Sequence, residues 1–165
     1  PSHNIMLTLR CYDSKDAAGS LDLFRQTVRE VNCADYDPIQ IDAWASVDID
    51  VLEWSNRFSG RFAYVALIDG CMAGFADMAT CGHLDRLFVS VRHQRRGVAK
   101  ALLARLKADA IESGIARILT DASITAKPFF EASGFAVVCK QTVKCRGVEF
   151  INYHMVLSVD EILVQ

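Results

Sequence analysis

Residues 94–99 combine a glycine with several cations at a junction between two kinds of hydrophobic pattern. The six residues read QRRGVA; the apolar run LFVSV lies just before them, and a long helical pattern begins directly afterwards. Backbone amides in the first turn of a helix have no intrahelical partners, and the helix dipole favours negative charge there. Gly97 lets an anion approach the main chain, and four cations surround it: Arg92, Arg95, Arg96 and Lys100. The junction therefore predicts a site for a ligand with several phosphate charges, although a basic helix start is also typical of solvated surface.

The elements that position this junction begin with a strand and a mostly helical first third. Residues 5–12 (IMLTLRCY) have a strand pattern, and residues 13–31 have apolar side chains at helical spacing. The apolar positions of that helix are Leu21, Phe24, Val28 and Val31, and its candidate capping residues are Asp13, Ser14 and Asp16.

Two short helices are predicted next. Pro38 begins the first, which places Ile41 and Trp44 on one face. The segment IDVLEWSNRF predicts the second, with Leu52 and Trp54 facing inward.

From Arg61 the hydrophobic period changes to two. Asp69 and Gly70 separate two apolar runs, which is a strong hairpin signal. With HLDRLFVSV as a third strand, residues 62–91 are predicted to form an antiparallel meander.

A helix over residues 97–114 follows, ended by Gly114 in a left-handed conformation. Its predicted buried side consists of Val98, Ala101, Leu102, Leu106 and Ile111. A strand over 116–122 makes a strand–helix–strand unit, whose two strands should be parallel with a right-handed crossover. A helix ending at Gly134 and strands over 135–143 and 150–158 complete the chain. The fold class is α+β (mixed α/β), with a mixed sheet covered by helices.

Composition limits the classes of protein. The chain has 165 residues, of which 52% are apolar and 23% charged, so one folded domain over 1–165 is expected and disorder is not. The net charge of −2 gives no long-range attraction to nucleic acid or anionic membrane. Without a run of about 20 apolar residues or a secretory signal pattern, a cytoplasmic location is expected. Six scattered cysteines without a CxxC pair indicate small buried hydrophobic residues or free thiols, with neither a disulfide framework nor a metal site.

Two motifs resemble those of the GNAT superfamily of N-acetyltransferases. QRRGVA is similar to the acetyl-CoA pyrophosphate loop Q/R-x-x-G-x-G/A, with Gln94, Gly97 and Ala99 at its defined places. SITAKPFFEASGF is similar to the family segment N-x-x-A-x-x-F-Y-x-x-x-G-F. The matching residues are Ser123, Ala126, Phe129, Phe130, Gly134 and Phe135. The resemblance covers residues 61–135 and implies one GNAT domain: a mostly antiparallel twisted sheet, helices on both faces, and acetyl-CoA as cofactor.

The resemblance also implies which residues contact acetyl-CoA. The phosphate loop and the segment after the next strand contribute Gln94, Arg95, Arg96, Gly97, Val98, Ala99, Lys100, Ser123, Ala126, Phe129 and Phe130. Main-chain amides of Leu87, Phe88 and Val89 should meet the thioester oxygen, because family strands splay at this point. Phe129 and Phe130 are equally compatible with an ordinary helix core.

In this family an amine attacks the thioester carbonyl directly, and it must first lose a proton. The resemblance places the base on the strand before the phosphate loop, where His83 and Asp85 share a face. An unperturbed histidine pKa of about 6.5 suits neutral pH, and the aspartate can accept a proton or orient the amine. The alternatives are a histidine in solvent and an aspartate in a salt bridge.

The family tyrosine that protonates the leaving thiolate is replaced by Phe130. Tyr153 is the first substitute and Ser123 a weaker one, although a tyrosine in that strand is also typical of core packing. Without a substitute the thiolate would take its proton from water or from the departing ammonium.

The acceptor should lie against the N-terminal helices, which form one wall of the substrate groove in relatives. Their aromatic and acidic residues suit a small cationic amine or an amino terminus: Asp35, Tyr36, Asp37 and Trp44. A solvated loop with a core tryptophan explains the same residues.

Other functions remain open. They are acetylation of an antibiotic or xenobiotic amine, and an acyl-CoA sensor without turnover. Nucleic-acid recognition through Arg92, Arg95 and Arg96 is disfavoured because the basic patch is isolated and lacks aromatic residues. The strand FINYHMVL, if it lies at a sheet edge, could pair between subunits of a homodimer.

Overall fold

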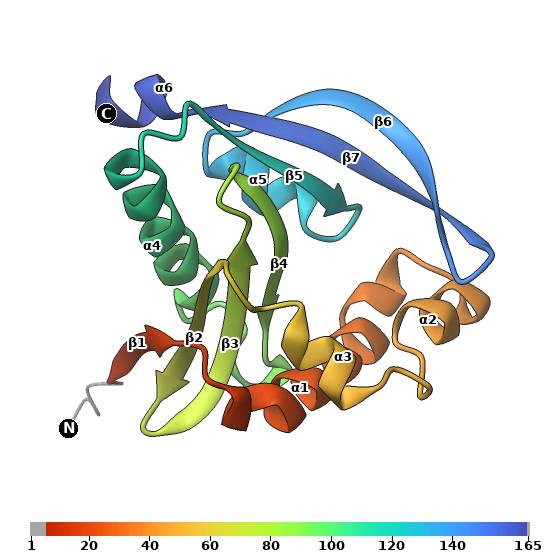
Figure 1. The fold of residues 1–165 in the computed structure, drawn as a ribbon. Helices are drawn as coiled ribbons and strands as arrows, with labels where there is room; N and C mark the ends of the chain where they lie inside the picture. Colours follow the sequence, from red (N-terminus) through yellow and green to blue (C-terminus); the bar gives the residue numbers. More distant parts are fainter. Residues whose placement is uncertain (1–5, 165) are drawn as a thin grey trace.

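The computed structural model describes residues 6–164, and seven of its segments form one sheet in the order β1-β2-β3-β4-β5-β7-β6 (Figure 1). The strands are β1 (Leu7–Cys11), β2 (Phe62–Ile68), β3 (Cys71–Met78), β4 (His83–Val89), β5 (Arg117–Ser123), β6 (Ala136–Cys145) and β7 (Val148–Ser158). The helices are α1 (Ala17–Glu30), α2 (Pro38–Trp44), α3 (Val51–Asn56), α4 (Val98–Glu112), α5 (Lys127–Ala132) and α6 (Val159–Val164). Ile5, the first residue of the predicted first strand, lies outside the described residues.

The predicted α+β class with a mostly antiparallel sheet is confirmed. β4 and β5 are parallel and α4 connects them, whereas the other neighbouring strands are antiparallel. The Asp-Gly hairpin joins β2 to β3: Asp69 has φ 50° and Gly70 has φ 83°. Two consecutive residues with positive φ make a type I′ turn, which matches the twist of the flanking strands. Arg146 (φ 48°) and Gly147 (φ 78°) form the same kind of turn between β6 and β7.

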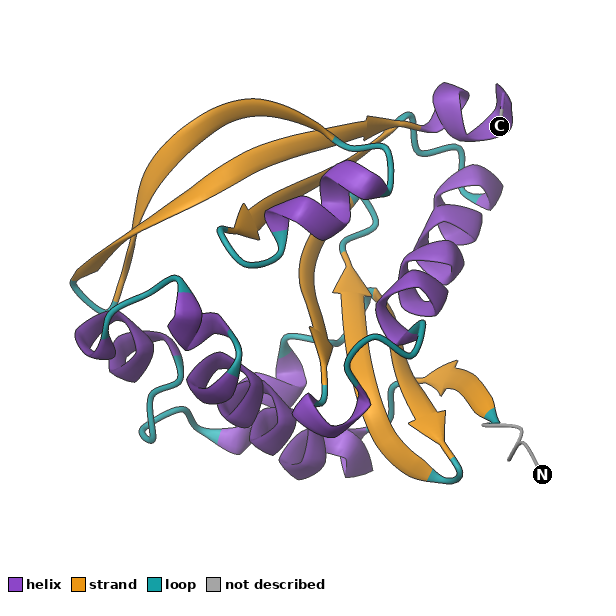
Figure 2. Ribbon diagram, turned by 180° about the vertical axis from the view of Figure 1, so that it is seen from behind, coloured by secondary structure: helices purple, strands orange, loops and turns teal. Residues whose placement is uncertain are grey.

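Helices cover both faces of the sheet (Figure 2). One core cluster joins the sheet to α4 and α5 through side chains such as Leu102, Leu106 and Phe130. The other joins the opposite face to α1, α2 and α3 through side chains such as Phe24, Trp54 and Phe75. Neighbouring β2 residues alternate between the two clusters, with Tyr64 in the first and Val65 in the second, as the strand period of two requires.

α4 lies unusually close to β3 because residue 74 is glycine. A Cβ atom at Gly74 would lie 2.8 Å from both the Phe88 carbonyl oxygen and Val98 Cγ1. The missing side chain lets the first turn of α4 pack against the sheet. Gly74 therefore fixes where the phosphate-loop helix begins.

The β6–β7 hairpin reaches over to α2 (Figure 1). Gln40 Nε2 donates to the Glu149 carbonyl oxygen at 2.9 Å, and Arg146 Nη1 donates to the Ala43 carbonyl oxygen at 2.7 Å. These contacts tie the last two strands to the N-terminal helices.

Several predicted details were wrong. Leu52 and Ile111, predicted to face the core, are 67% and 39% exposed. The cysteines are free thiols, but they are not buried: Cys11, Cys33, Cys71, Cys81 and Cys139 are exposed, and Cys145 is intermediate. The strand FINYHMVL is not an edge strand, since β7 lies between β5 and β6, and the edge strands of the described sheet are β1 and β6. Local patterns could not reveal this, because each strand's place in the sheet depends on partners distant in sequence.

Candidate active site

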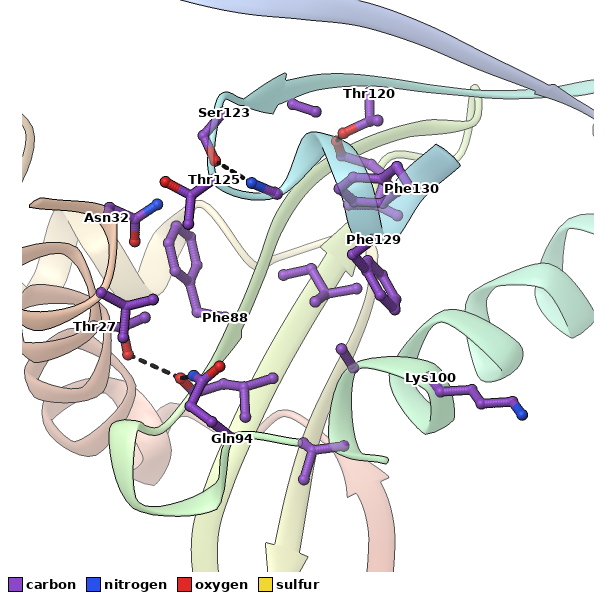
Figure 3. A pocket seen from close by; sticks show the side chains of 18 of the residues that line it. Thr27, Asn32, Phe88, Gln94, Lys100, Thr120, Ser123, Thr125, Phe129 and Phe130 are labelled. Carbon is purple, nitrogen blue, oxygen red and sulfur yellow. Dashed lines mark hydrogen bonds between the residues drawn. The ribbon is translucent and has the colours of Figure 1, made fainter. Parts of the chain in front are cut away.

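The site is centred where β4 and β5 part. These strands pair only at His83–Leu119 and Leu84–Thr120, near the start of β4. Beyond them the strands diverge, and a cavity of about 520 Å³ opens between the strand ends, α4 and α5 (Figure 3).

The sequence-predicted cofactor residues converge on this first cavity. Leu87, Phe88, Val89, Gln94, Arg95, Gly97, Val98, Ala99, Lys100, Ser123, Ala126, Phe129 and Phe130 line it. Arg96, at the same turn, does not. The cavity is therefore basic at the start of α4 and aromatic on the side of α5.

The α4 end of the cavity is suited to a diphosphate. Gly97 caps the helix with φ 80°, and the Ala101 amide is the one that donates to the Gly97 carbonyl oxygen, at 3.0 Å. The amides of Val98, Ala99 and Lys100 precede that first helical hydrogen bond and remain available for a ligand. The residues of this turn therefore fit the diphosphate of acetyl-CoA.

Gln94 has a positioning contact that its place in the motif did not predict. Its side-chain Nε2 donates to the Val89 carbonyl oxygen at 2.8 Å, and Thr27 Oγ1 donates to the same oxygen at 3.0 Å. Figure 3 shows Thr27 and Gln94 on either side of this strand end. The loop and α1 are thereby fastened to the end of β4.

The splay leaves backbone amides directed into the gap. The Ser90 amide donates to Ala73 on β3 at 2.8 Å, so even-numbered residues at this end of β4 direct their amides toward β3. The direction of the backbone amides alternates along a strand. The amides of Leu87 and Val89 therefore point away from β3, toward the gap from which β5 has diverged. Such amides can stabilise a developing oxyanion.

A second cavity, of about 620 Å³, adjoins the first. Five residues line both cavities: Trp44, Asp85, Phe88, Asp121 and Ser123. From this junction, the second cavity extends into the space between the N-terminal helices and the β6–β7 hairpin. A molecule in the second cavity would therefore meet the end of a ligand in the first.

Carboxylates and imidazoles form a chain beside the junction. His83 Nδ1 lies 2.5 Å from Asp85 Oδ1, and His83 Nε2 lies 3.2 Å from Asp121 Oδ2. The other oxygen of Asp121 is 2.7 Å from His154 Nδ1 and accepts from Gln141 Nε2 at 2.9 Å. Arg61 forms an ion pair with Asp85. His83 itself lines neither cavity, so it reaches them through its two carboxylate partners.

This chain moves the pKa of each of its central members. The hydrogen bond to Asp85 and the nearby Asp121 charge raise the pKa of His83 above its ordinary 6.5, outweighing the opposing effect of burial. The His83 hydrogen bond and the Arg61 charge lower the pKa of Asp85 against the effect of burial. Burial raises the pKa of Asp121, but hydrogen bonds from His154, His83 and Gln141 outweigh it, so the net shift is downward. The expectation that His83 keeps an ordinary pKa was therefore wrong.

The candidates for proton donor differ in position. Phe130 is buried and lines the first cavity without a polar group. Ser123 lines both cavities, and its oxygen accepts from the Ala126 amide at 3.0 Å, which leaves its own proton free to be donated (Figure 3). Tyr153 lines neither cavity, and its ring lies 5.1 Å from Lys127 Nζ.

The residues expected to contact the acceptor also differ in position, since only some of them line a cavity. Tyr36 and Trp44 line the second cavity. Asp35 accepts from Thr125 at 2.7 Å, and Asp37 caps α2, so both carboxylates are used within the protein. The expected acidic wall is provided by other residues, including Asp85 and Asp121.

Sequence reasoning missed Asp121, which lines both cavities. The strand that contains it was predicted, as was its parallel pairing with the His83 strand. The register His83–Leu119 places Asp121 two residues further on, next to Asp85 on the neighbouring strand. That predicted pairing was the signal that could have identified Asp121.

Residues 6–164 offer neither a metal cluster nor a helix that could span a membrane. These residues contain no cluster of three or more histidine, cysteine, aspartate or glutamate side chains that could hold a metal ion. No helix within them has the length and hydropathy needed to cross a membrane.

Comparisons with known proteins agree with this geometry. Residues 32–157 match a family model described as an acetyltransferase (GNAT) domain. The chain is 37% identical to YafP of Escherichia coli, an uncharacterised N-acetyltransferase, over 90% of this chain and 94% of YafP.

Solved structures show the same fold. A GCN5-related N-acetyltransferase from Rhodopseudomonas palustris has a TM-score of 0.90 at 29% identity, over 96% of this chain and 99% of that one. The PaiA N-acetyltransferase from Thermoplasma acidophilum, solved with coenzyme A, has a TM-score of 0.75 at 15% identity, over 93% and 99% of the two chains. By the family match, the identity to YafP and the cofactor cavity, the chain belongs to the GNAT superfamily and is an acetyl-CoA-dependent N-acetyltransferase.

Proposed function

We propose that this enzyme acetylates the primary amine of a small molecule at the junction of its two cavities. Acetyl-CoA supplies a thioester-activated acetyl group. The observation that carries the proposal is that both cavities share Asp85, Asp121 and Ser123 at the point where β4 and β5 part. An amine in the second cavity would then face the acyl end of a cofactor in the first. An amino terminus is a second acceptor that the same junction could take.

The first cavity binds the cofactor through two kinds of contact. The free amides at the start of α4 hold the diphosphate, with Arg95 and Lys100 as the lining cations. Phe129 and Phe130 contact the pantetheine arm from α5. Arg96 acts only as a nearby positive charge, which solvent screens.

His83 is the proposed base, and it acts through Asp121. When His83 is neutral with its proton on Nδ1, facing Asp85, the lone pair of Nε2 faces Asp121 Oδ2 at 3.2 Å. Two acceptors that face each other favour a proton between them, so this contact adds to the larger effect of the Asp85 hydrogen bond in raising the pKa of His83. Asp121 orients the acceptor ammonium, and the proton released by the amine passes to His83 Nε2. Asp85 holds the ring in this tautomer.

Ser123 is the proposed donor to the leaving sulfur. Its oxygen accepts a hydrogen bond from the Ala126 amide, so the hydroxyl proton is directed elsewhere, and the residue lines both cavities. A hydrogen bond from Ser123 would stabilise the thiolate as the carbon–sulfur bond breaks. Tyr153 has no part in this proposal, because it lines neither cavity.

The proposal includes a cytoplasmic location. Five cysteines are exposed and all six are free, which fits a compartment that keeps thiols reduced.

An acyl-CoA sensor without turnover is the second candidate, because the family tyrosine is replaced by the apolar Phe130. Two measurements separate it from the enzyme: the melting temperature with acetyl-CoA, and thiol release against a panel of primary amines. Acetylation requires a ligand-dependent rise in melting temperature and amine-dependent thiol release. A rise without release on any amine would establish the sensor, and no rise at saturating acetyl-CoA would contradict both candidates.

A further inference from the structure

The second cavity is lined by several aromatic side chains together with charged and polar residues. Its lining includes Phe24, Tyr36, Trp44, Trp54, Phe88 and Phe150, which come from α1, the segment before α2, α2, α3, β4 and β7. A volume of about 620 Å³ is within the range of small-molecule sites.

The aromatic rings are packed against one another in one cluster. Trp44 is central: its ring centroid lies 5.6 Å from that of Tyr36, 6.2 Å from those of Phe88 and Phe150, and 6.3 Å from that of Phe24. These pairs are edge-to-face, with interplanar angles between 64° and 75°. Rings fixed in this way present a rigid surface at little entropic cost.

The polar groups of two rings are already used inside the protein. The Tyr36 hydroxyl donates to the Ile151 carbonyl oxygen at 2.8 Å and accepts from the Ile124 amide at 3.0 Å. Trp54 Nε1 donates to Ser20 Oγ at 2.9 Å. These two residues therefore offer a ligand only apolar ring surface.

Accessible ring surface is concentrated at the junction with the cofactor cavity. Phe24, Tyr36, Trp54 and Phe150 are buried, whereas Trp44 and Phe88 are half-buried. Trp44 and Phe88 are also the two aromatic residues that line both cavities. A ligand ring on Trp44 and Phe88 would therefore lie close to the reacting acyl group.

Charges are arranged around this aromatic surface. Asp85 and Asp121 lie at the junction and can face an ammonium group. The remaining charged lining residues have both signs: Asp48, Glu53, Arg57, Arg86 and Arg146. The side-chain oxygen of Asn152, which pairs in register with Ser123, is buried and receives no hydrogen bond from a described residue. An amine N–H of a bound acceptor is a suitable donor to it.

We infer that the acceptor is an arylalkylamine: a primary amine on a short alkyl arm of an aromatic ring. The ring packs on Trp44 and Phe88, and the ammonium faces Asp85, Asp121 and Asn152. The arm is short because the ring surface and the carboxylates meet at the same junction. This inference rests on the proposed acetyl transfer and names its substrate class.

The test compares amines that differ in one property. With the full chain and saturating acetyl-CoA, thiol release is measured with 2-phenylethylamine, 2-cyclohexylethylamine, n-butylamine and spermidine. We expect kcat/KM for 2-phenylethylamine to exceed that for n-butylamine by about tenfold or more, because the ring adds buried apolar area. The kcat/KM for 2-phenylethylamine should exceed the kcat/KM for 2-cyclohexylethylamine by about two- to tenfold, because contacts between aromatic rings add stabilisation beyond that of the buried apolar area. Equal or higher values for any of the three other amines would overturn the inference and leave acetyl transfer standing.

A variant localises the effect. Phe150→Leu removes a buried ring of the second cavity that packs edge-to-face on Trp44, with the two ring centroids 6.2 Å apart, and it therefore loosens the surface that holds the ligand ring; Phe135→Leu is the matched control, since Phe135 is equally well buried in the other core cluster. Phe150→Leu should raise KM for 2-phenylethylamine about fivefold with unchanged KM for acetyl-CoA, and the control should change neither. Equal KM increases in the two variants would overturn the inference, because the effect would then be one of core packing.

A binding measurement without turnover tests the proposed arylalkylamine site independently of acetyl transfer. Titration of the coenzyme A complex with 2-phenylethylamine should change tryptophan fluorescence saturably, because Trp44 lies at the ring site. Saturable binding with no thiol release on any amine would support the arylalkylamine site and overturn acetyl transfer. No fluorescence change together with release on spermidine would overturn the site and support acetyl transfer.

Discussion

His83 Nε2 lies 3.2 Å from Asp121 Oδ2, across the one parallel strand pair of the described sheet. The contact joins a residue that lines neither cavity to one that lines both. In the proposed mechanism, this contact lets a base that is set back from the cavities exchange protons with a bound amine.

The first prediction concerns the pH dependence of kcat/KM. His83 must be neutral to accept a proton, and its pKa is raised, so activity should fall as pH falls through a value above 6.5. Initial rates from pH 5 to 10 measure this acid limb. His83→Gln should lose about 100-fold in kcat/KM, the usual contribution of a general base, while acetyl-CoA binding is retained. A variant with the unchanged acid limb would refute His83 as the base.

Removal of the Asp85 charge should shift the acid limb of the pH profile of kcat/KM. The largest contribution to the raised pKa of His83 is its hydrogen bond to Asp85. In Asp85→Asn the charge is lost, so the pKa of His83 should fall and the acid limb should shift to lower pH. Asp42→Asn is the control, because Asp42 is a surface carboxylate that pairs with Arg29. A limb that stays in place in Asp85→Asn would show that the coupling seen in the structure does not govern the reaction.

Gly97 is required for its backbone conformation and not for space. It has φ 80°, and a Cβ atom there would meet nothing within 4 Å. Gly97→Ala should cost about 1 kcal/mol in the free energy of unfolding and raise KM for acetyl-CoA, because an alanine disfavours this φ. Gly60 has φ 70° and equally open surroundings, so Gly60→Ala should lose similar stability without a change in KM. Urea denaturation and cofactor titration test the pair, and an unaltered KM in Gly97→Ala would exclude the proposed phosphate contact.

Ser123→Ala should lower kcat by about tenfold or more and change KM less. The reason is that the hydrogen bond to the leaving sulfur forms only as the carbon–sulfur bond breaks. The variant should also lose about 1 kcal/mol of stability, because Ser123 accepts from the Ala126 amide at 3.0 Å. Ser133→Ala removes the hydroxyl of the residue that follows α5, which donates to the Phe129 carbonyl oxygen, and it serves as control. If the two variants have the same kcat, Ser123 only stabilises the turn between β5 and α5.

Gly74→Ala should destabilise the fold by about 1–3 kcal/mol, because the added Cβ would lie 2.8 Å from Phe88 backbone and from Val98. The melting temperature with and without acetyl-CoA measures this effect. Since α4 must move to make room, the stabilisation by acetyl-CoA should also decrease. Wild-type stability in this variant would contradict the prediction, because it would mean that α4 can move away from β3 without loss of packing energy.

The sequence was informative where local chemistry determines structure. The Asp69–Gly70 hairpin, the helix ended by Gly114 and the Pro38 helix start all follow from backbone preferences of single residues. The phosphate loop could be predicted for the same reason, since glycine, cations and a helix start are adjacent in the chain. Among its residues only Arg96 does not line the cavity.

Features that depend on distant segments could not be predicted in this way. The position of β7 inside the sheet depends on pairing with β5 and β6, which no local pattern specifies. Leu52 and Ile111 have apolar side chains at helical spacing, yet no other element covers them. Asp85, two residues away, makes the largest contribution to the raised pKa of His83, but the additional contribution of Asp121 comes from a residue 38 positions away. The second cavity likewise depends on distant segments, because its lining combines residues of α1, α2, α3 and the β6–β7 hairpin.

The hydrogen bonds between the β6–β7 hairpin and α2 have a further consequence for how such an enzyme changes its substrate. In the proposed mechanism, the residues that bind and activate the thioester come mainly from the middle of the chain, whereas the residues proposed to contact the acceptor come largely from the segments on either side of it. Those outer segments can therefore accumulate substitutions, and the enzyme can acquire a new preference, while the phosphate loop and the proton relay are inherited unchanged.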